Sequence, residues 1–102
     1  MGNEKLNELK QFFGAYFHQD WNLDASAPDD VVRLFISDGY SNDELINLAK
    51  DIEKYAATKT DDAATEEGLL KELGCYYMPS ADNVGAKAWL NHVATLLRSA
   101  IE

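Results

Sequence analysis

Hydrophobic residues recur at spacings of three and four in five stretches of the chain, which places them on one face of an α-helix in each stretch. This pattern predicts helices over about residues 3–18, 28–39, 42–57, 65–74 and 82–101. In the first helix the apolar face is formed by Leu6, Leu9, Phe12, Phe13, Tyr16 and Phe17. Residues 19–27 and 58–64 lack the pattern and are predicted to be connectors.

Local signals mark where two of these helices begin. Pro28 suits a first helical turn, because its missing N–H is not needed there. Asp29 and Asp30 follow it, where negative charge is favoured by the helix dipole. Ser41 and Glu44 have the spacing of a capping box, which predicts that the third helix starts directly after Ser41.

The fold class follows from the helices and from the lack of strand signals. Apolar and polar residues do not alternate convincingly anywhere in the sequence, as they would in a half-buried strand. Residues 74–79 end in Pro79 and are expected to be irregular or extended. We therefore predict an all-α protein, a compact single-domain bundle of about five helices over residues 1–102.

Charge is distributed unevenly along the chain. The net charge is −9, and residues 20–67 carry all of it, with thirteen acidic against four basic residues. Such a surface repels phosphate, so direct nucleic-acid binding is disfavoured. It attracts a basic partner and can speed association with it. The simpler alternative is that the acidic residues only keep the protein in solution.

The residues that usually carry chemistry are few and scattered. Cys75, His18 and His92 are too far apart in sequence for a closely spaced zinc-ligand set. A nucleophilic Cys–His pair would need Cys75 and a histidine to meet in a pocket, whereas Cys75 is expected to be a small buried hydrophobic residue. No glycine-rich phosphate loop is present. We expect no enzymatic activity, cofactor, metal or small-molecule substrate.

The sequence also predicts where the protein works. A single cysteine cannot form a disulfide within the chain, which favours a reducing compartment. No stretch approaches the roughly 20 apolar residues of a membrane helix, and the N-terminus has no signal-peptide pattern. We expect a cytoplasmic protein that does not bind membranes.

Residues 12–21, FFGAYFHQDW, are unusually rich in aromatic side chains. Because large exposed apolar patches are uncommon, we expect these rings to pack in the core, with Trp21 covering one end of the bundle. Asp20 is expected to hold the adjoining turn by accepting hydrogen bonds. This run resembles the N-terminal signature of CdiI-type immunity proteins, the antidotes of bacterial contact-dependent growth inhibition systems.

The resemblance implies a small helical protein that binds the C-terminal toxin domain of a cognate CdiA-type surface protein, one to one. Toxins of this kind are often nucleases, and some partners of this family are similar to RNase A. An acidic immunity protein could occupy the basic active-site cleft of such a toxin. The alternative is an acidic helical adaptor or regulator that binds another basic protein.

Two sets of residues receive different expected roles. A motif shared by antidotes against different toxins is better explained by the fold, so a structural role is expected for Phe12, Phe13, Gly14, Tyr16, Phe17, Asp20 and Trp21. Toxin contacts are expected in the acidic middle, where the leading candidates are Asp29, Asp30, Asp38, Tyr40, Asp43, Glu44 and Asp51. Tyr40 is included because it follows Gly39 in a predicted loop and tyrosine is enriched at binding hot spots.

Overall fold

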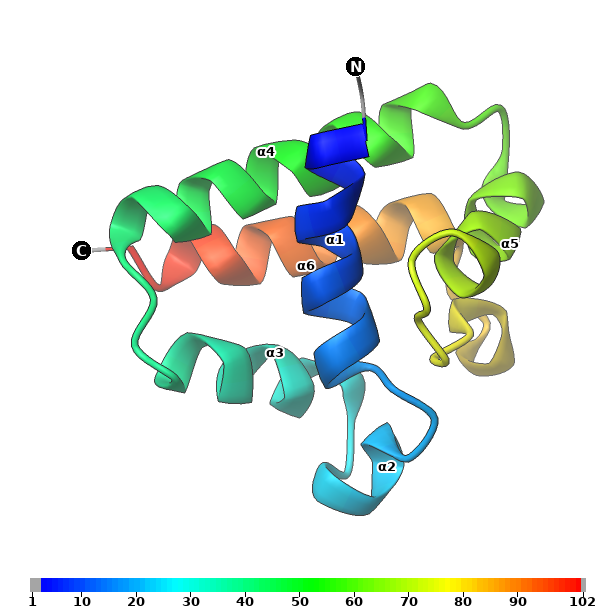
Figure 1. Cartoon of the computed structure of the whole chain (residues 1–102). Coiled ribbons are helices and arrows are strands. Elements are labelled where there is room, and N and C mark those ends of the chain that lie inside the picture. Colours follow the sequence, from blue (N-terminus) through cyan, green and yellow to red (C-terminus); the bar gives the residue numbers. More distant parts are fainter. Residues whose placement is uncertain (1–2, 102) are drawn as a thin grey trace.

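Two long helices, α4 (Asn42–Thr58) and α6 (Ala86–Ser99), lie side by side in opposite directions at the centre of the fold (Figure 1). In this computed structural model, residues 3–101 are described, with side chains for 8–23 and 25–101. The apolar stripes of both helices are buried and include Leu45, Leu48, Ile52, Leu90, Val93 and Leu97. These stripes belong to one hydrophobic core, to which buried residues of the helices around them also contribute.

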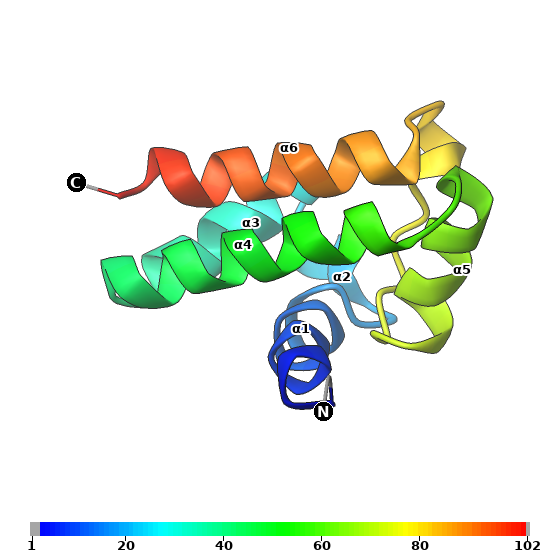
Figure 2. The same ribbon diagram turned by 90° about the horizontal axis from the view of Figure 1, so that it is seen from above.

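Three further helices cover this central pair. Helix α1 (Asn3–Tyr16) is seen end-on in Figure 2, where α4 and α6 lie lengthwise, so it crosses them. Helix α3 (Pro28–Ser37) packs against α6 and α1, and α5 (Asp62–Lys71) packs against α6 near its first turn. The one-turn helix α2 (Trp21–Asp24) connects α1 to α3, and a 3-10 turn, η1 (Pro79–Asp82), precedes α6.

Aromatic rings fill the space where the end of α1 meets α6. Phe13 and Phe17 are fully buried, and their ring centroids lie 5.9 and 5.3 Å from that of Trp89. Tyr77 packs on the same indole at 4.9 Å. The extended segment that carries Tyr77 is fixed to α1 by a main-chain hydrogen bond of 2.8 Å from the Tyr76 N–H to the Phe17 carbonyl.

The predicted all-α class is confirmed: residues 3–101 form six α-helices and one 3-10 turn, with no strand among them. The capping box is also present, since the Glu44 N–H donates to Ser41 Oγ and the Ser41 N–H donates to Glu44 Oε1, both at 3.2 Å. The side chain of Leu6, predicted to lie on the stripe of α1, falls outside the described residues. Across the described chain, every helix is too short or too polar to cross a membrane.

Two helix starts differ from the prediction, one because of a side-chain cap and the other because of a left-handed turn. Helix α5 begins at Asp62 rather than near residue 65, since the Asp61 carboxylate accepts a hydrogen bond of 2.8 Å from the Ala64 N–H. Helix α6 begins four residues later than predicted. The chain first turns at Asn83, whose φ is +59°, and the Lys87 N–H then donates to the Asp62 carboxylate at 3.0 Å.

Candidate functional site

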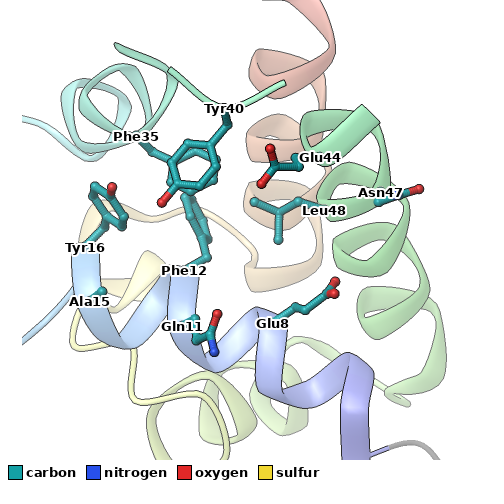
Figure 3. A pocket seen from close by; sticks show the side chains of 10 residues that line it. All are labelled: Glu8, Gln11, Phe12, Ala15, Tyr16, Phe35, Tyr40, Glu44, Asn47 and Leu48. Atoms are coloured by element: carbon teal, nitrogen blue, oxygen red, sulfur yellow. The ribbon is translucent and has the colours of Figure 1, made fainter. Parts of the chain in front are cut away.

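A groove of about 480 Å³ lies where α1, the end of α3 and the start of α4 meet (Figure 3). Its floor is apolar and consists of Phe12, Phe35 and Leu48, which are 2%, 6% and 6% exposed. The lining is completed by Ala15 and Tyr16 and by the polar or amphipathic residues Glu8, Gln11, Tyr40, Glu44 and Asn47. The groove therefore combines an apolar floor with a polar rim.

An aromatic wall forms one side of the groove. The Tyr40 ring stacks on Phe35, with centroids 4.2 Å apart and planes inclined by 17°, yet Tyr40 remains 38% exposed. Phe12 and Tyr16 approach Phe35 edge to face, at 4.7 and 5.1 Å. Phe12 and Tyr16 thus support Phe35, and the stack on Phe35 positions the Tyr40 ring without a partner, which lowers the side-chain entropy that binding would cost.

The loop between α3 and α4 holds Tyr40 in place. Gly39 has a φ of +92°, a left-handed conformation that suits glycine and turns the chain between Asp38 and Tyr40. The Tyr16 hydroxyl donates a hydrogen bond to the Asp38 carboxylate. The pKa of Tyr16 is raised well above its ordinary value, mainly by burial and to a smaller extent by hydrogen bonding to Asp38 and Tyr40. The hydrogen bond from the Tyr16 hydroxyl to Asp38 ties α1 to this loop.

Two carboxylates stand on opposite helices at the rim. Glu44 belongs to the first turn of α4, and only its Oε1 accepts the capping hydrogen bond from the Ser41 N–H. Glu8 comes from α1, and Figure 3 shows Leu48 between the two glutamates. None of the described residues that line the groove is basic. The rim is therefore negatively charged and has no internal counter-charge.

The seven residues predicted to contact a toxin fall into separate places. Tyr40 and Glu44 line the groove, while Asp38 and Asp43 lie beside it at the junction of α3 and α4. Asp29 and Asp30 occupy the opposite end of α3, and Asp51 lies on α4 about two turns beyond Glu44. They therefore do not form one continuous patch.

The predicted acidic residues on α3 and those on α4 also differ in whether a basic side chain pairs with them. The Asp29 carboxylate lies 3.0 Å from His92 Nε2, and Asp30 accepts hydrogen bonds from Arg33 and Ser26, both at 3.0 Å. By contrast, the carboxylates of Asp43 and Asp51 form no hydrogen bond or ion pair among the described residues. The negative charge at the start of α4 is therefore less compensated than that at the start of α3.

The aromatic signature residues are mostly interior. Phe12, Phe13 and Phe17 are buried, while Tyr16 and Trp21 are half-buried. Gly14 lies beside Gly74: a Cβ on Gly74 would be 3.6 Å from the Gly14 Cα, an ordinary contact distance, so it is the φ of +70° at Gly74 that favours glycine there. Phe12 and Tyr16 also line the groove, so they belong to both the core and the candidate site.

Asp20 differs from its expected role. Its carboxylate forms no capping hydrogen bond with α2. The turn is instead held by the main chain of Asp20, whose N–H donates to His18 Nδ1 at 3.1 Å and whose carbonyl accepts from the Leu23 N–H at 3.0 Å. A short helix of one turn can be fixed by its backbone in this way, which sequence-based reasoning about side chains does not anticipate.

Sequence reasoning missed the rim residues Glu8, Gln11 and Asn47. A signal exists for each: Glu8, Gln11 and Phe12 share one face of α1, and Glu44, Asn47 and Leu48 share one face of α4. The sequence shows which residues share a face of one helix. It does not show that the two faces come to lie opposite each other.

Cys75, considered above as a nucleophile, is not in the environment that a nucleophilic cysteine needs. Cys75 is fully buried, and burial raises the pKa of its thiol to about 12, whereas a nucleophilic cysteine requires a lowered pKa. Its Sγ lies 3.6 Å from the Tyr77 carbonyl oxygen. Among the described residues, no group of three or more His, Cys, Asp or Glu side chains is placed to hold a metal ion.

Comparison with known proteins decides the family. Residues 5–97 match the family model described as CdiI immunity protein, which covers nearly the whole chain. The chain belongs to the CdiI immunity protein family. The resemblance seen in the aromatic run is thereby confirmed, and the protein is an immunity protein against a contact-dependent growth inhibition toxin. No curated protein and no solved structure compared with the chain matches it.

Proposed function

We propose that this CdiI immunity protein neutralises a nuclease toxin by covering its basic active-site cleft with the acidic surface at the junction of α3 and α4. The supporting observation is the placement of charge. Thirteen of the eighteen acidic residues lie in residues 20–67. Within that region, Asp38, Asp43 and Glu44 gather around a preformed groove that has no basic lining residue among those described.

The chemistry of a nuclease fits such a surface. A nuclease must hold phosphate groups, and it does so with lysine, arginine and histidine side chains. Carboxylates presented at similar spacing compete for the same donors and form charge-assisted hydrogen bonds with them. An RNase A-like ribonuclease is one toxin of this kind.

The proposal includes the partner and the setting. The partner is the C-terminal toxin domain of a cognate CdiA-type surface protein, bound one to one by the whole chain acting as a single domain. Binding takes place in the cytoplasm, where a nuclease toxin finds its substrate, and it requires no catalysis or cofactor. We expect the affinity for the toxin to depend on a few central residues rather than on the area of the interface.

Co-expression with the CdiA-type toxin domain encoded beside this gene tests the function. We expect a one-to-one complex by size-exclusion chromatography with light scattering, and loss of nucleic-acid cleavage when the immunity protein is added in equal amount. A toxin domain from an unrelated system is the control and should keep its activity. If the cognate toxin is not bound, or still cleaves when bound, the proposal is wrong.

A further inference from the structure

We propose that the groove between α1, α3 and α4 receives an arginine side chain of the toxin, with its guanidinium held between Glu8, Glu44 and the Tyr40 ring. The inference deepens the proposed function and rests on it. It assigns one central contact within the acidic surface and defines its chemistry. The floor, the charge and the aromatic wall of the groove each favour this side chain.

The floor suits the aliphatic part of a long side chain. Phe12, Phe35 and Leu48 present apolar atoms at the bottom of the groove although each is almost completely buried. The three methylene groups of an arginine can cover such atoms while the charged end stays at the rim. The volume of about 480 Å³ lies within the range of sites that enclose small ligands.

The charge at the rim selects a cation. Glu8 and Glu44 approach from different helices, and no basic side chain lines the groove among the described residues. The capping box uses one oxygen of Glu44, so its second carboxylate oxygen can accept a new hydrogen bond. A neutral apolar side chain in the same place would remove water from both carboxylates without replacing their hydrogen bonds, which is costly.

The aromatic wall favours arginine over lysine. One face of the Tyr40 ring is covered by Phe35, yet the residue keeps 38% of its surface exposed at the rim. A planar guanidinium can stack on such a ring and also donate hydrogen bonds sideways to carboxylates, whereas an ammonium is a compact, strongly hydrated charge. Because Tyr40 is already positioned by Phe35 and by the turn at Gly39, the site is preorganised for stacking.

The groove can be tested without the toxin by titrating the full chain with n-propylguanidinium and following amide and aromatic NMR signals. We expect saturable shifts concentrated at Phe12, Tyr40 and Glu44. The neutral isostere n-propylurea should cause much smaller shifts, and the variant E8Q/E44Q should lose the response to n-propylguanidinium. Equal responses to both probes, or shifts located elsewhere, would overturn the proposal.

The affinity for the toxin provides the second test. Glutamine at position 44 can still serve in a capping box, so E8Q/E44Q removes two charges while the helix start is kept. The matched control is E53Q/E67Q, which removes two charges from carboxylates that pair with Arg98 and Lys71 and do not line the groove. We expect E8Q/E44Q to raise the Kd at least about tenfold more than the control does.

The outcomes separate this inference from the proposed function. If the wild-type protein binds the toxin and both double variants bind equally well, the groove does not hold an arginine, but the immunity function stands. If the wild-type protein does not bind the toxin at all, both proposals are wrong. Circular dichroism and thermal unfolding of each variant show whether a weaker Kd reflects a damaged fold, and Y40L, which removes the stacking ring, should reproduce the loss.

Discussion

Gly68 shows how one position can couple two helices. It lies buried in the middle of α5, where glycine costs about 1 kcal/mol relative to alanine in helix propensity. A Cβ at this position would lie 2.2 Å from Tyr55 Oη and 3.0 Å from Glu72 Oε1. The glycine therefore leaves space for the Tyr55 hydroxyl, which donates a hydrogen bond of 2.5 Å to Glu72.

Replacing Gly68 with alanine should destabilise the protein despite the better helix propensity of alanine. We expect the free energy of unfolding to fall by about 1–3 kcal/mol, as measured by urea denaturation, because the tyrosine must move. Removing the hydroxyl in G68A/Y55F should recover part of this loss relative to G68A alone. Gly14→Ala is the control, since its Cβ would meet its nearest atom, the Leu73 carbonyl oxygen, at an ordinary 3.6 Å.

A loss in G68A that Y55F does not relieve would show that another contact is responsible. Equal losses in G68A and G14A would mean that both reflect a general effect of replacing glycine on this fold. The unfolding slope with urea should stay constant, since a change in that slope would indicate an altered unfolded or native state rather than a local clash.

At the scale of elements, the hydrogen bond from Tyr55 to Glu72 joins the end of α4 to the end of α5. Lys59 donates a hydrogen bond of 2.8 Å to Glu72 Oε1, and its ammonium lies 5.0 Å from the centre of the Tyr55 ring. The pKa of Glu72 is lowered below its ordinary value of 4.5, mainly by the hydrogen bond from Lys59 and secondly by the one from Tyr55. The pair of helices is therefore linked by a group that titrates in acid.

This lowered pKa predicts how stability depends on pH. A carboxyl whose pKa is lower in the folded state stabilises the fold above its ordinary pKa, and this contribution disappears as the pH falls through the folded value. Glu72→Gln should therefore unfold more easily than wild type near pH 7, by at most about 1 kcal/mol because the side chain is half exposed. We expect the difference to shrink below the ordinary carboxyl pKa of 4.5.

Urea denaturation of both proteins between neutral pH and the acid range measures this difference. Glu67→Gln is the control, because Glu67 and Lys71 form an exposed pair within α5 alone. It should change stability less than Glu72→Gln does. A difference between wild type and Glu72→Gln that persists in strong acid would contradict the electrostatic explanation and indicate altered packing instead.

How much of the fold can be predicted from the sequence depends on how local its cause is. The five long helices were predicted because hydrophobic periodicity is visible within each stretch, and the Ser41–Glu44 box because both members lie within four residues. Helix α2 and turn η1 were missed because four residues are too few for a period. The start of α6 depends on Asp62 contacting Lys87, 25 residues away, which no local pattern reveals.

In the candidate site, too, features with a local cause could be predicted and features that depend on distant contacts could not. Tyr40 and Glu44 were predicted from residue type, loop position and charge, and both line the groove. The groove itself was not predicted, because it exists only where α1 crosses α4 and brings Glu8 opposite Glu44. Asp29 and Asp30 looked equivalent to Asp43 and Glu44 in sequence, since each pair occupies the first turn of a helix.

At the scale of the whole molecule, charge acts over two distances. The net charge of −9 attracts a basic partner over about 8 Å in physiological salt, and this long-range effect changes mainly the association rate. Charges buried by the partner act at contact distance and change mainly the dissociation rate. Variants with equal total charge but different positions can therefore locate the interface.

Two matched double variants make this comparison, Asp43→Asn with Glu44→Gln and Asp29→Asn with Asp30→Asn. Each removes two negative charges from the first turn of a helix, so the effects on total charge and on the helix dipole are alike. We expect both to slow association with the toxin at low salt to a similar degree. Only the variant at Asp43 and Glu44 should also speed dissociation, by about tenfold.

Surface plasmon resonance at low salt and at roughly 0.5 M salt separates the two effects, since screening removes the long-range part while partly buried pairs persist. The faster dissociation of the variant at Asp43 and Glu44 should therefore remain at high salt, because it arises from lost contacts. Faster dissociation of the variant at Asp29 and Asp30 would instead place the interface at the start of α3. Unchanged dissociation of both would mean that the acidic residues only steer the encounter, and that apolar or aromatic contacts hold the complex together.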